Sequence, residues 1–196
     1  MSFWYFVVYS LMIGIVAGVV AAFVWFLIIN WFKPKIKIGE VIGKTTLKFD
    51  EKEDESKVYL MKFINYTKPN IENVSIDLFL MFDYFHGNHK NYRVKRLKLR
   101  NDSYKFISGL REKNHEMHNN CVQIVILDDL EERWTGENAW LHLQITTYHS
   151  RSGSRKVFVQ KFTNPNVIQE GEFCSGHTFE IMPSDKKRHK KVKPSA

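Results

Sequence analysis

The sequence predicts an N-terminal transmembrane α-helix followed by a mainly-β domain, an antiparallel β-sandwich of about eight or nine strands. The first 32 of the 196 residues contain no Asp, Glu, Lys, Arg or His. After Lys37, short runs alternate between apolar and polar residues, which is the pattern of half-buried strands. Helical periodicity is scarce in this part of the chain. The alternating pattern also fits a closed β-barrel, which stays open as the alternative.

The membrane anchor is predicted over residues 1–32. Residues 3–32 are apolar or weakly polar, and as a helix they would span about 45 Å, more than the ~30 Å of a hydrocarbon core. Aromatic residues gather at the two ends of this run, where side chains of this type favour the headgroup layers: Trp4, Tyr5, Tyr9, Trp25, Trp31 and Phe32. A signal peptide fits less well, because the run is too long and no positive segment precedes it.

The residues that flank the span predict its orientation. Lys33, Lys35 and Lys37 follow the span, whereas no charged side chain precedes it. Because cytoplasmic flanks are enriched in Lys and Arg, we expect a cell (inner) membrane protein with its N-terminus outside and its β-domain in the cytoplasm. Two cysteines suit a reducing compartment and exclude a disulfide-dense scaffold or a four-cysteine zinc site.

Small residues recur at every fourth position of the predicted helix, at Ser10, Gly14, Gly18 and Ala22. This spacing places them on one helix face, where a second helix can approach closely. The sequence therefore predicts a homo-oligomer formed in the lipid bilayer. No acidic or basic residue lies within the span, so nothing there suggests an ion relay.

The β-domain is expected over residues 33–184, followed by a disordered basic tail over residues 185–196. Turns are predicted at 86–88 and 150–153, and a helical turn near 110–118. The predicted strands cover residues 36–42, 46–49, 58–64, 74–82, 92–99, 121–127, 141–146, 157–162 and 178–181.

Five cations within eight positions form the candidate site for a phosphate ligand or a lipid headgroup: Arg93, Lys95, Arg96, Lys98 and Arg100. In a continuous strand, the last three would share one face and the first two the other. The alternative interpretation is a charged edge strand that blocks unwanted pairing with other chains.

Histidine spacing offers a weaker hypothesis of metal binding. His115, His118 and Cys121 have spacings that could converge on Zn²⁺, and His86 and His89 repeat the first spacing. The alternative is a polar loop that leads into a strand in which Cys121 is a small apolar residue. We expect no metal and no cofactor.

The absence of known catalytic and nucleic-acid-binding motifs argues against catalysis and against sequence-specific binding of nucleic acid. The chain has no Gly-rich phosphate loop, no GxSxG and no HExxH, so we expect no enzyme. Residues 186–193 carry six of the eight units of net positive charge. For an anchored protein, such a tail indicates attraction to an anionic membrane surface, and no nucleic-acid-binding motif accompanies it.

Residues 127–136 (LDDLEERWTG), a strand and then Thr147 and Tyr148 resemble part of the cytoplasmic immunoglobulin-like domain of inward-rectifier potassium channels. The resemblance covers about thirty residues and does not extend to the pore helix, selectivity filter or second membrane helix of that family. It implies a regulatory or ligand-sensing module without potassium conduction. The architecture is also similar to that of small prokaryotic membrane-anchored antiphage effectors, in which a cytosolic β-domain senses a cyclic nucleotide.

Two functions are therefore expected. In the first, the β-domain binds a ligand such as a cyclic nucleotide and controls self-association of the transmembrane helices, which requires the ligand to prefer one assembly. In the second, the chain is a passive membrane-tethered adaptor whose β-domain binds a protein partner.

Overall fold

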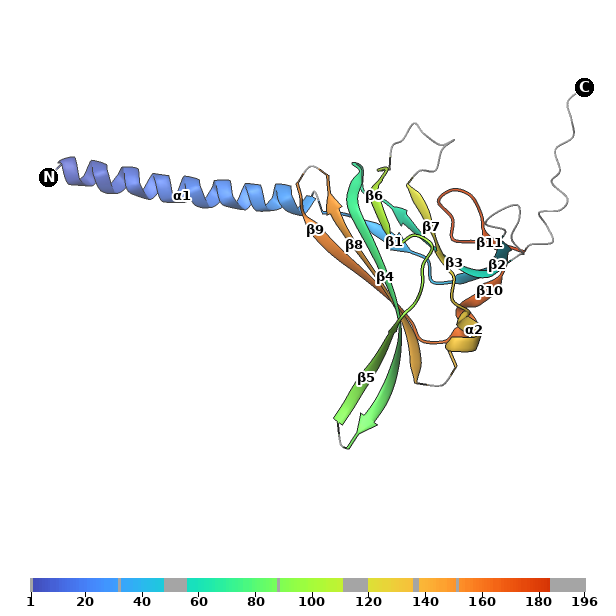
Figure 1. Ribbon diagram of the computed structural model, residues 1–196. Coiled ribbons are helices and arrows are strands. Elements are labelled where there is room, and N and C mark those ends of the chain that lie inside the picture. Colours follow the sequence, from blue (N-terminus) through green and yellow to red (C-terminus); the bar gives the residue numbers. More distant parts are fainter. Residues whose placement is uncertain are drawn as a thin grey trace, which may run out of the picture.

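The computed structural model describes residues 2–31, 33–47, 56–87, 89–110, 120–135, 138–150 and 152–183. Helix α1 (Ser2–Trp31) extends away from the β-domain (Figure 1). Its segment Phe3–Ile29 is long and apolar enough to cross a membrane, and none of its most apolar stretch is buried against the rest of the protein. The predicted N-terminal helix is therefore confirmed as an exposed apolar helix of membrane-spanning length.

The β-domain contains two five-stranded sheets. In the first sheet, the central strand β3 has β7 on one side, β1 and β2 on the other, and β10 beside β2. Its strands are β1 (Ile36–Ile38), β2 (Ile42–Leu47), β3 (Ser56–Asn65), β7 (Cys121–Ile126) and β10 (Ile168–Glu170). The second sheet has the order β5-β4-β8-β9, and β6 also pairs with β4. Its strands are β4 (Ile71–His86), β5 (His89–Arg96), β6 (Ser103–Ile107), β8 (Ala139–His149) and β9 (Arg155–Phe162).

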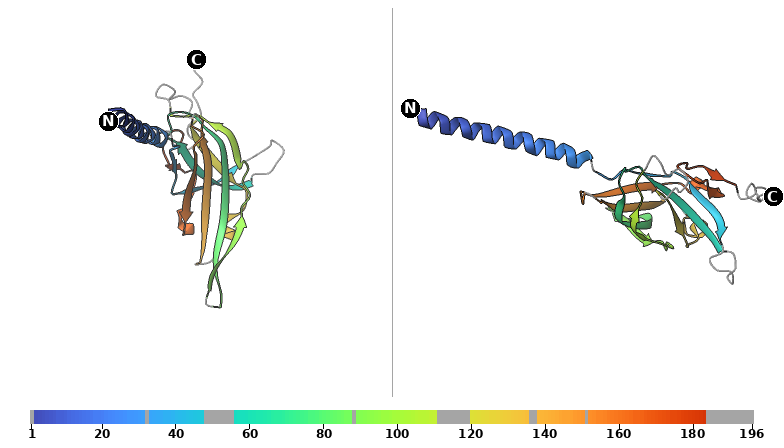
Figure 2. Two further views of the ribbon diagram at one scale, coloured as in Figure 1. Left: turned by 90° about the vertical axis from the view of Figure 1, so that its left-hand side faces the viewer. Right: turned by 90° about the horizontal axis from the view of Figure 1, so that it is seen from above.

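The two sheets pack face to face around a single main core (Figure 2). Alternate residues of each strand point inward, and each sheet contributes fully buried side chains, among them Tyr59, Met61, Phe63, Ile124, Ile126, Ile76, Leu78, Leu80, Leu141, Leu143 and Ile145. The predicted sandwich is confirmed, and the sheets are not closed into a barrel. It is not wholly antiparallel, because β10 runs parallel to β2.

A short ribbon covers the outer face of the first sheet. Strand β11 (Glu172–Phe173) pairs with β12 (Ile181–Met182), after the 3-10 turn η1 (Pro165–Val167) and β10. Phe173 packs with Val58 and Leu60, which point away from the main core. No such layer covers the outer face of the second sheet in the described part of the chain.

One segment links the two sheets at a sandwich edge. After β5 the chain leaves β4 and reaches β7, where Leu99 bridges Ile126 and the Arg100 amide donates to the Val125 carbonyl oxygen at 2.9 Å. The chain then returns to β4 and forms β6 along the same edge of β4 with which β5 pairs. The predicted strand 92–99 was therefore too long, because the chain changes sheets after Arg96.

The sequence pattern does not reveal several of the short elements. The predicted strands 36–42 and 46–49 correspond to β1 and β2, with a break at Gly39, and β6, β10, β11 and helix α2 (Leu130–Arg133) were not predicted. The predicted turns occur at Gly87 (φ 61°) and Gly153 (φ 64°), where glycine readily adopts the left-handed conformation. The helical turn predicted near 110–118 falls almost entirely, and the basic tail completely, outside the described residues.

Candidate binding surfaces

In the structure, the five predicted cations lie at different places and do not form one group. Arg93 and Lys95 lie in β5 opposite Phe82 and Leu80, on the side that faces the other sheet. Arg96 lies opposite Phe79, on the outer side. Because β5 ends there, Lys98 and Arg100 belong to the segment that crosses to β7, and the expected common face of Arg96, Lys98 and Arg100 does not form.

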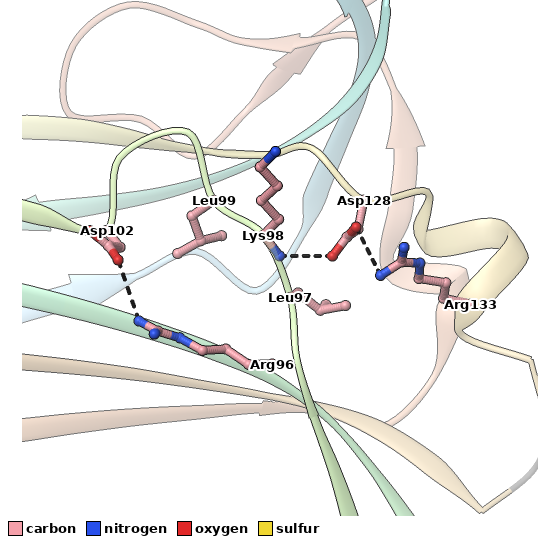
Figure 3. A pocket seen from close by; sticks show the side chains of 7 residues that line it. All are labelled: Arg96, Leu97, Lys98, Leu99, Asp102, Asp128 and Arg133. Carbon is pink, nitrogen blue, oxygen red and sulfur yellow. Dashed lines mark hydrogen bonds and ion pairs between the residues drawn. The ribbon is translucent and has the colours of Figure 1, made fainter.

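Arg96 is matched by carboxylates. Its guanidinium lies 2.8 Å from a carboxylate oxygen of Asp77 and 3.4 Å from one of Asp102, and Figure 3 shows the second contact. An arginine with two acidic neighbours attracts a phosphate less than an isolated one. The feature most suggestive of a phosphate site in the sequence is therefore partly neutralised within the fold.

The crossing segment borders an open hollow of about 410 Å³. Asp128 accepts a hydrogen bond from the Lys98 amide at 2.7 Å and lies 2.8 Å from the Arg133 guanidinium (Figure 3). This hollow thus combines cations with carboxylates and has no concentrated positive charge. Its lining residues are Arg96, Leu97, Lys98, Leu99, Asp102, Asp128 and Arg133.

A larger hollow of about 730 Å³ lies at the β4–β5 hairpin and is lined by Phe82, Tyr84, Tyr92 and Arg93. Strand β8 pairs with β4 only as far as Phe82, so the rest of the hairpin projects beyond the sandwich (Figure 1). Tyr84 and Tyr92 are about half exposed. No carboxylate of the described residues forms an ion pair with Arg93 or with the neighbouring Lys95.

Aromatic and cationic side chains also meet on the outer side of the second sheet. The Tyr92 ring contacts the Trp140 ring edge to face, with 5.6 Å between the centroids. The Lys161 ammonium lies 4.2 Å from the centroid of the same Trp140 ring, within the range of a cation–π interaction. Strands β5, β8 and β9 each contribute one of these residues.

The small residues of α1 form an open face. Ser10, Gly14, Gly18 and Ala22 are exposed, and a Cβ atom added to Gly14 or Gly18 would meet no atom within 4 Å. The helix therefore leaves room for a second backbone along this face, and self-association of α1 stays a prediction.

The histidine positions gain no support as a metal site. His86 and His89 face each other across the end of the β4–β5 hairpin, and Cys121 begins β7. His115 and His118 lie outside the described residues. Within the described ranges, no three His, Cys, Asp or Glu side chains form a cluster that could hold a metal ion.

Lys62 is a buried cation that the sequence pattern does not reveal. It is 2% exposed, and its ammonium donates to the carbonyl oxygens of Cys174, Gly176 and Thr178 at 2.7–2.8 Å. Burial lowers the pKa of the Lys62 ammonium, whereas hydrogen bonds to the three oxygens favour its charged form. Its only signal in the sequence is a single charge within the apolar run 58–64.

A second missed group joins α2 to the first sheet. The Lys57 ammonium lies 3.0 Å from Asp129 and 2.6 Å from Glu131, and the Lys44 ammonium lies 2.9 Å from Glu131. The Tyr59 hydroxyl donates to Asp129 at 2.7 Å. This hydrogen bond, followed by the contacts with Lys57, lowers the pKa of Asp129 to about 2. Asp129 also caps α2 by accepting from the amides of Glu131 and Glu132.

No protein-family model matches the chain, and no curated protein matches it. Three accessible features therefore carry the functional interpretation: the β4–β5 hairpin hollow, the outer side of the second sheet and the small-residue face of α1. The buried Lys62 group and the Asp129 group have structural roles, because each ties one segment of the chain to the first sheet.

Proposed function

We propose that the protein is a single-pass membrane protein that acts as a tethered adaptor, with α1 in the inner membrane and the β-domain in the cytoplasm. The exposed apolar helix supports the anchor, and Lys33, Lys35 and Lys37 support the orientation. Alkaline phosphatase fused after residue 183 should be inactive and a green fluorescent protein fused there should be bright. The reverse result would contradict this orientation.

The β4–β5 hairpin is the proposed binding site for a protein partner. The observation that carries this proposal is an aromatic hollow on a hairpin that projects beyond the strand β8 and the rest of the sandwich. Exposed Tyr and Arg side chains are enriched among the residues that dominate binding at protein interfaces. By contrast, the five cations of the predicted phosphate site lie on two sides of β5 and in the segment that crosses to β7. Arg96 also has two acidic neighbours. The geometry therefore supports an adaptor better than a phosphate sensor.

The charge of the hairpin indicates the chemistry of the partner. Arg93 and Lys95 are exposed and have no acidic side chain paired with them among the described residues. Strand β5 is also an edge strand, because β4 is its one partner among the strands that the structure describes. An extended acidic segment could pair with this edge while an apolar side chain enters the hollow. We propose such a segment as the ligand.

Site-specific crosslinking tests the adaptor. Benzoylphenylalanine in place of Tyr84 in the full chain should crosslink one partner in cells, whereas the same probe at Tyr66, which lies outside the hairpin, should not. The purified partner should then bind the full chain in nanodiscs about tenfold more weakly after Arg93→Glu with Lys95→Glu. Lys68→Glu with Lys105→Glu is the matched control, since both lysines are exposed. Equal losses in the two double variants would contradict a hairpin site.

A ligand-sensing effector is the second candidate, and the open small-residue face of α1 favours it. In that function, a ligand such as a cyclic nucleotide would bind the β-domain and favour one oligomer of α1. Gly14→Leu with Gly18→Leu should then abolish crosslinking between copies in membranes while calorimetry still detects cyclic nucleotide binding. A passive adaptor should keep partner binding in this variant. A strictly monomeric protein with and without cyclic nucleotides would contradict the effector.

A further inference from the structure

Strand β9 has an outward face of unusual composition. Register with β8 places Arg155, Val157, Val159 and Lys161 on the same side, away from the core. All four are exposed, and the exposed fractions of Val157 and Val159 are 42% and 54%. Two adjacent valines between two cations bring apolar surface and positive charge together on an edge strand.

The neighbouring strands extend this surface. Lys161 lies over the ring of Trp140 in β8, and this ring in turn contacts Tyr92 in β5. Phe106 in β6, which pairs with Glu72 of β4, is 65% exposed. Trp and Tyr rings accompanied by Lys or Arg are the side chains that favour the headgroup layer of a bilayer.

The two sheets differ sharply in their exposed apolar side chains. The outer face of the first sheet is covered by β11 and β12, and none of its strands has an exposed large apolar side chain in the described ranges. In the second sheet, such side chains lie on the outer side of three strands, at Tyr92 and Val94 of β5, Phe106 of β6, and Val157 and Val159 of β9. The asymmetry therefore marks one particular side of the sandwich.

This side of the sandwich lies toward the membrane anchor. Only residues 32–35 separate α1 from β1, and four extended residues reach about 14 Å. The second sheet lies on the α1 side of the domain, and the last residues of β8 and the first residues of β9 lie near the end of α1 (Figure 1). A bilayer that contains α1 is therefore within reach of this sheet.

We propose that the outer side of the second sheet, centred on Val157, Val159, Trp140 and Lys161, docks onto the anionic headgroup layer of the bilayer that contains α1. The valines and Trp140 would enter the interfacial layer, and Lys161 and Arg155 would contact lipid phosphates. This proposal rests, like the proposed function, on the insertion of α1. The partner site lies on the other side of the hairpin, at Phe82, Tyr84 and Arg93, and Tyr92 borders both surfaces.

Lipid quenching in proteoliposomes tests the docking. The full chain with Cys121→Ala and Cys174→Ala receives one cysteine, either Val159→Cys or Gln123→Cys, which is labelled with an environment-sensitive fluorophore. Gln123 is the matched control because it is exposed on β7 of the first sheet. In vesicles of phosphatidylcholine and phosphatidylglycerol with nitroxide lipids, the label at 159 should be quenched and the label at 123 should not.

A charge variant adds a second measurement. Lys161→Glu in the chain labelled at 159 should reduce the quenching constant about fivefold, whereas Lys98→Glu, an exposed lysine at the other edge of the sandwich, should leave it unchanged. Equal quenching at 159 and 123, or none at either, would overturn docking. A blue shift at 159 without lipid quenching would indicate a second protein copy and would also overturn it.

Alkaline carbonate extraction separates the two proposals. A chain that resists extraction but shows no quenching at 159 would refute docking and leave the tethered adaptor intact. A chain that is extracted would refute the membrane anchor, and with it both proposals.

Discussion

Lys62 shows how one residue fixes the position of a whole segment. Its ammonium has three donors, and three backbone carbonyl oxygens of residues 174–178 accept them. The Phe173 ring lies 6.0 Å from the same ammonium. The segment that follows β11 is therefore held on the first sheet through its backbone, and the His177 ring adds a contact with the Asn120 side chain at 2.9 Å.

Lys62→Met should destabilise the β-domain by about 3 kcal/mol, because three carbonyl oxygens, that of Gly176 buried and the other two partly buried, would lose the ammonium donor. Lys105→Met is the control, since Lys105 is exposed. Denaturant unfolding of the full chain in detergent micelles measures both free energies. In addition, amide exchange of residues 172–178 should accelerate only in Lys62→Met. Similar losses in both variants would contradict the role assigned to Lys62.

Asp129 makes the stability of the domain depend on pH. The pKa of Asp129 in the folded chain is about 2, below its ordinary value of 3.8. The folded state therefore binds this proton more weakly than the unfolded state, and the stabilisation is present above pH 4 and lost as the pH falls from 4 to 2. Glu131, whose pKa is lowered by Lys57 and Lys44, acts in the same direction.

Asp129→Asn should flatten this acid dependence. The free energy of unfolding, measured between pH 6 and pH 2, should fall less steeply in the variant than in the unmodified chain, since the variant no longer has a carboxylate at this position. Parallel curves for the two proteins would show that the Asp129 carboxylate does not control acid stability.

At the scale of elements, the strength of the local pattern decided what could be predicted. Helix α1 and the inward alternation of β4 through Ile76, Leu78 and Leu80 are continuous patterns, and the structure contains both. Strands β10 and β11 have three and two residues, too few for alternation to show. The pairing of Arg96 with Asp77 depends on the register between β5 and β4, which local sequence does not determine.

Gly109 marks a close approach between two elements. Its amide donates to the Asn70 side chain at 3.0 Å, and a Cβ atom there would overlap the carbonyl oxygens of Lys68 and Pro69. Gly109→Ala should therefore destabilise the domain by about 2 kcal/mol in denaturant unfolding. Gly14→Ala, at a position with open space around it, should leave the free energy unchanged. A Gly109→Ala protein of unchanged stability would contradict this packing.

At the scale of the whole molecule, the anchor and the β-domain are separate structural units. Residues of α1 between Phe3 and Ile28 are exposed, and the main core of the sandwich contains no residue of the helix. The domain therefore obtains its stability from contacts within residues 33–183. Its exposed surfaces divide by side, with aromatic and cationic residues on the second sheet and a covering ribbon on the first.

Removal of residues 1–32 should leave the β-domain folded. Thermal unfolding followed by near-ultraviolet circular dichroism should give the same midpoint for the shortened and the full chain within about 2 °C, a difference of less than about 1 kcal/mol. A clearly lower midpoint for the shortened chain would show that α1 contributes to the fold.

The position of β1 has a mechanical consequence. A pull on the domain is transmitted from the helix through residues 32–35 to β1, whose three residues pair only with the end of β3. Hydrogen bonds of the Lys35 amide to Thr67 and of the Tyr66 amide to Lys35 lie directly in that path. Under tension these few bonds would break one after another, so β1 would peel away before the sandwich opened. Such a strand acts as a yielding link that lengthens the tether while the folded domain remains intact.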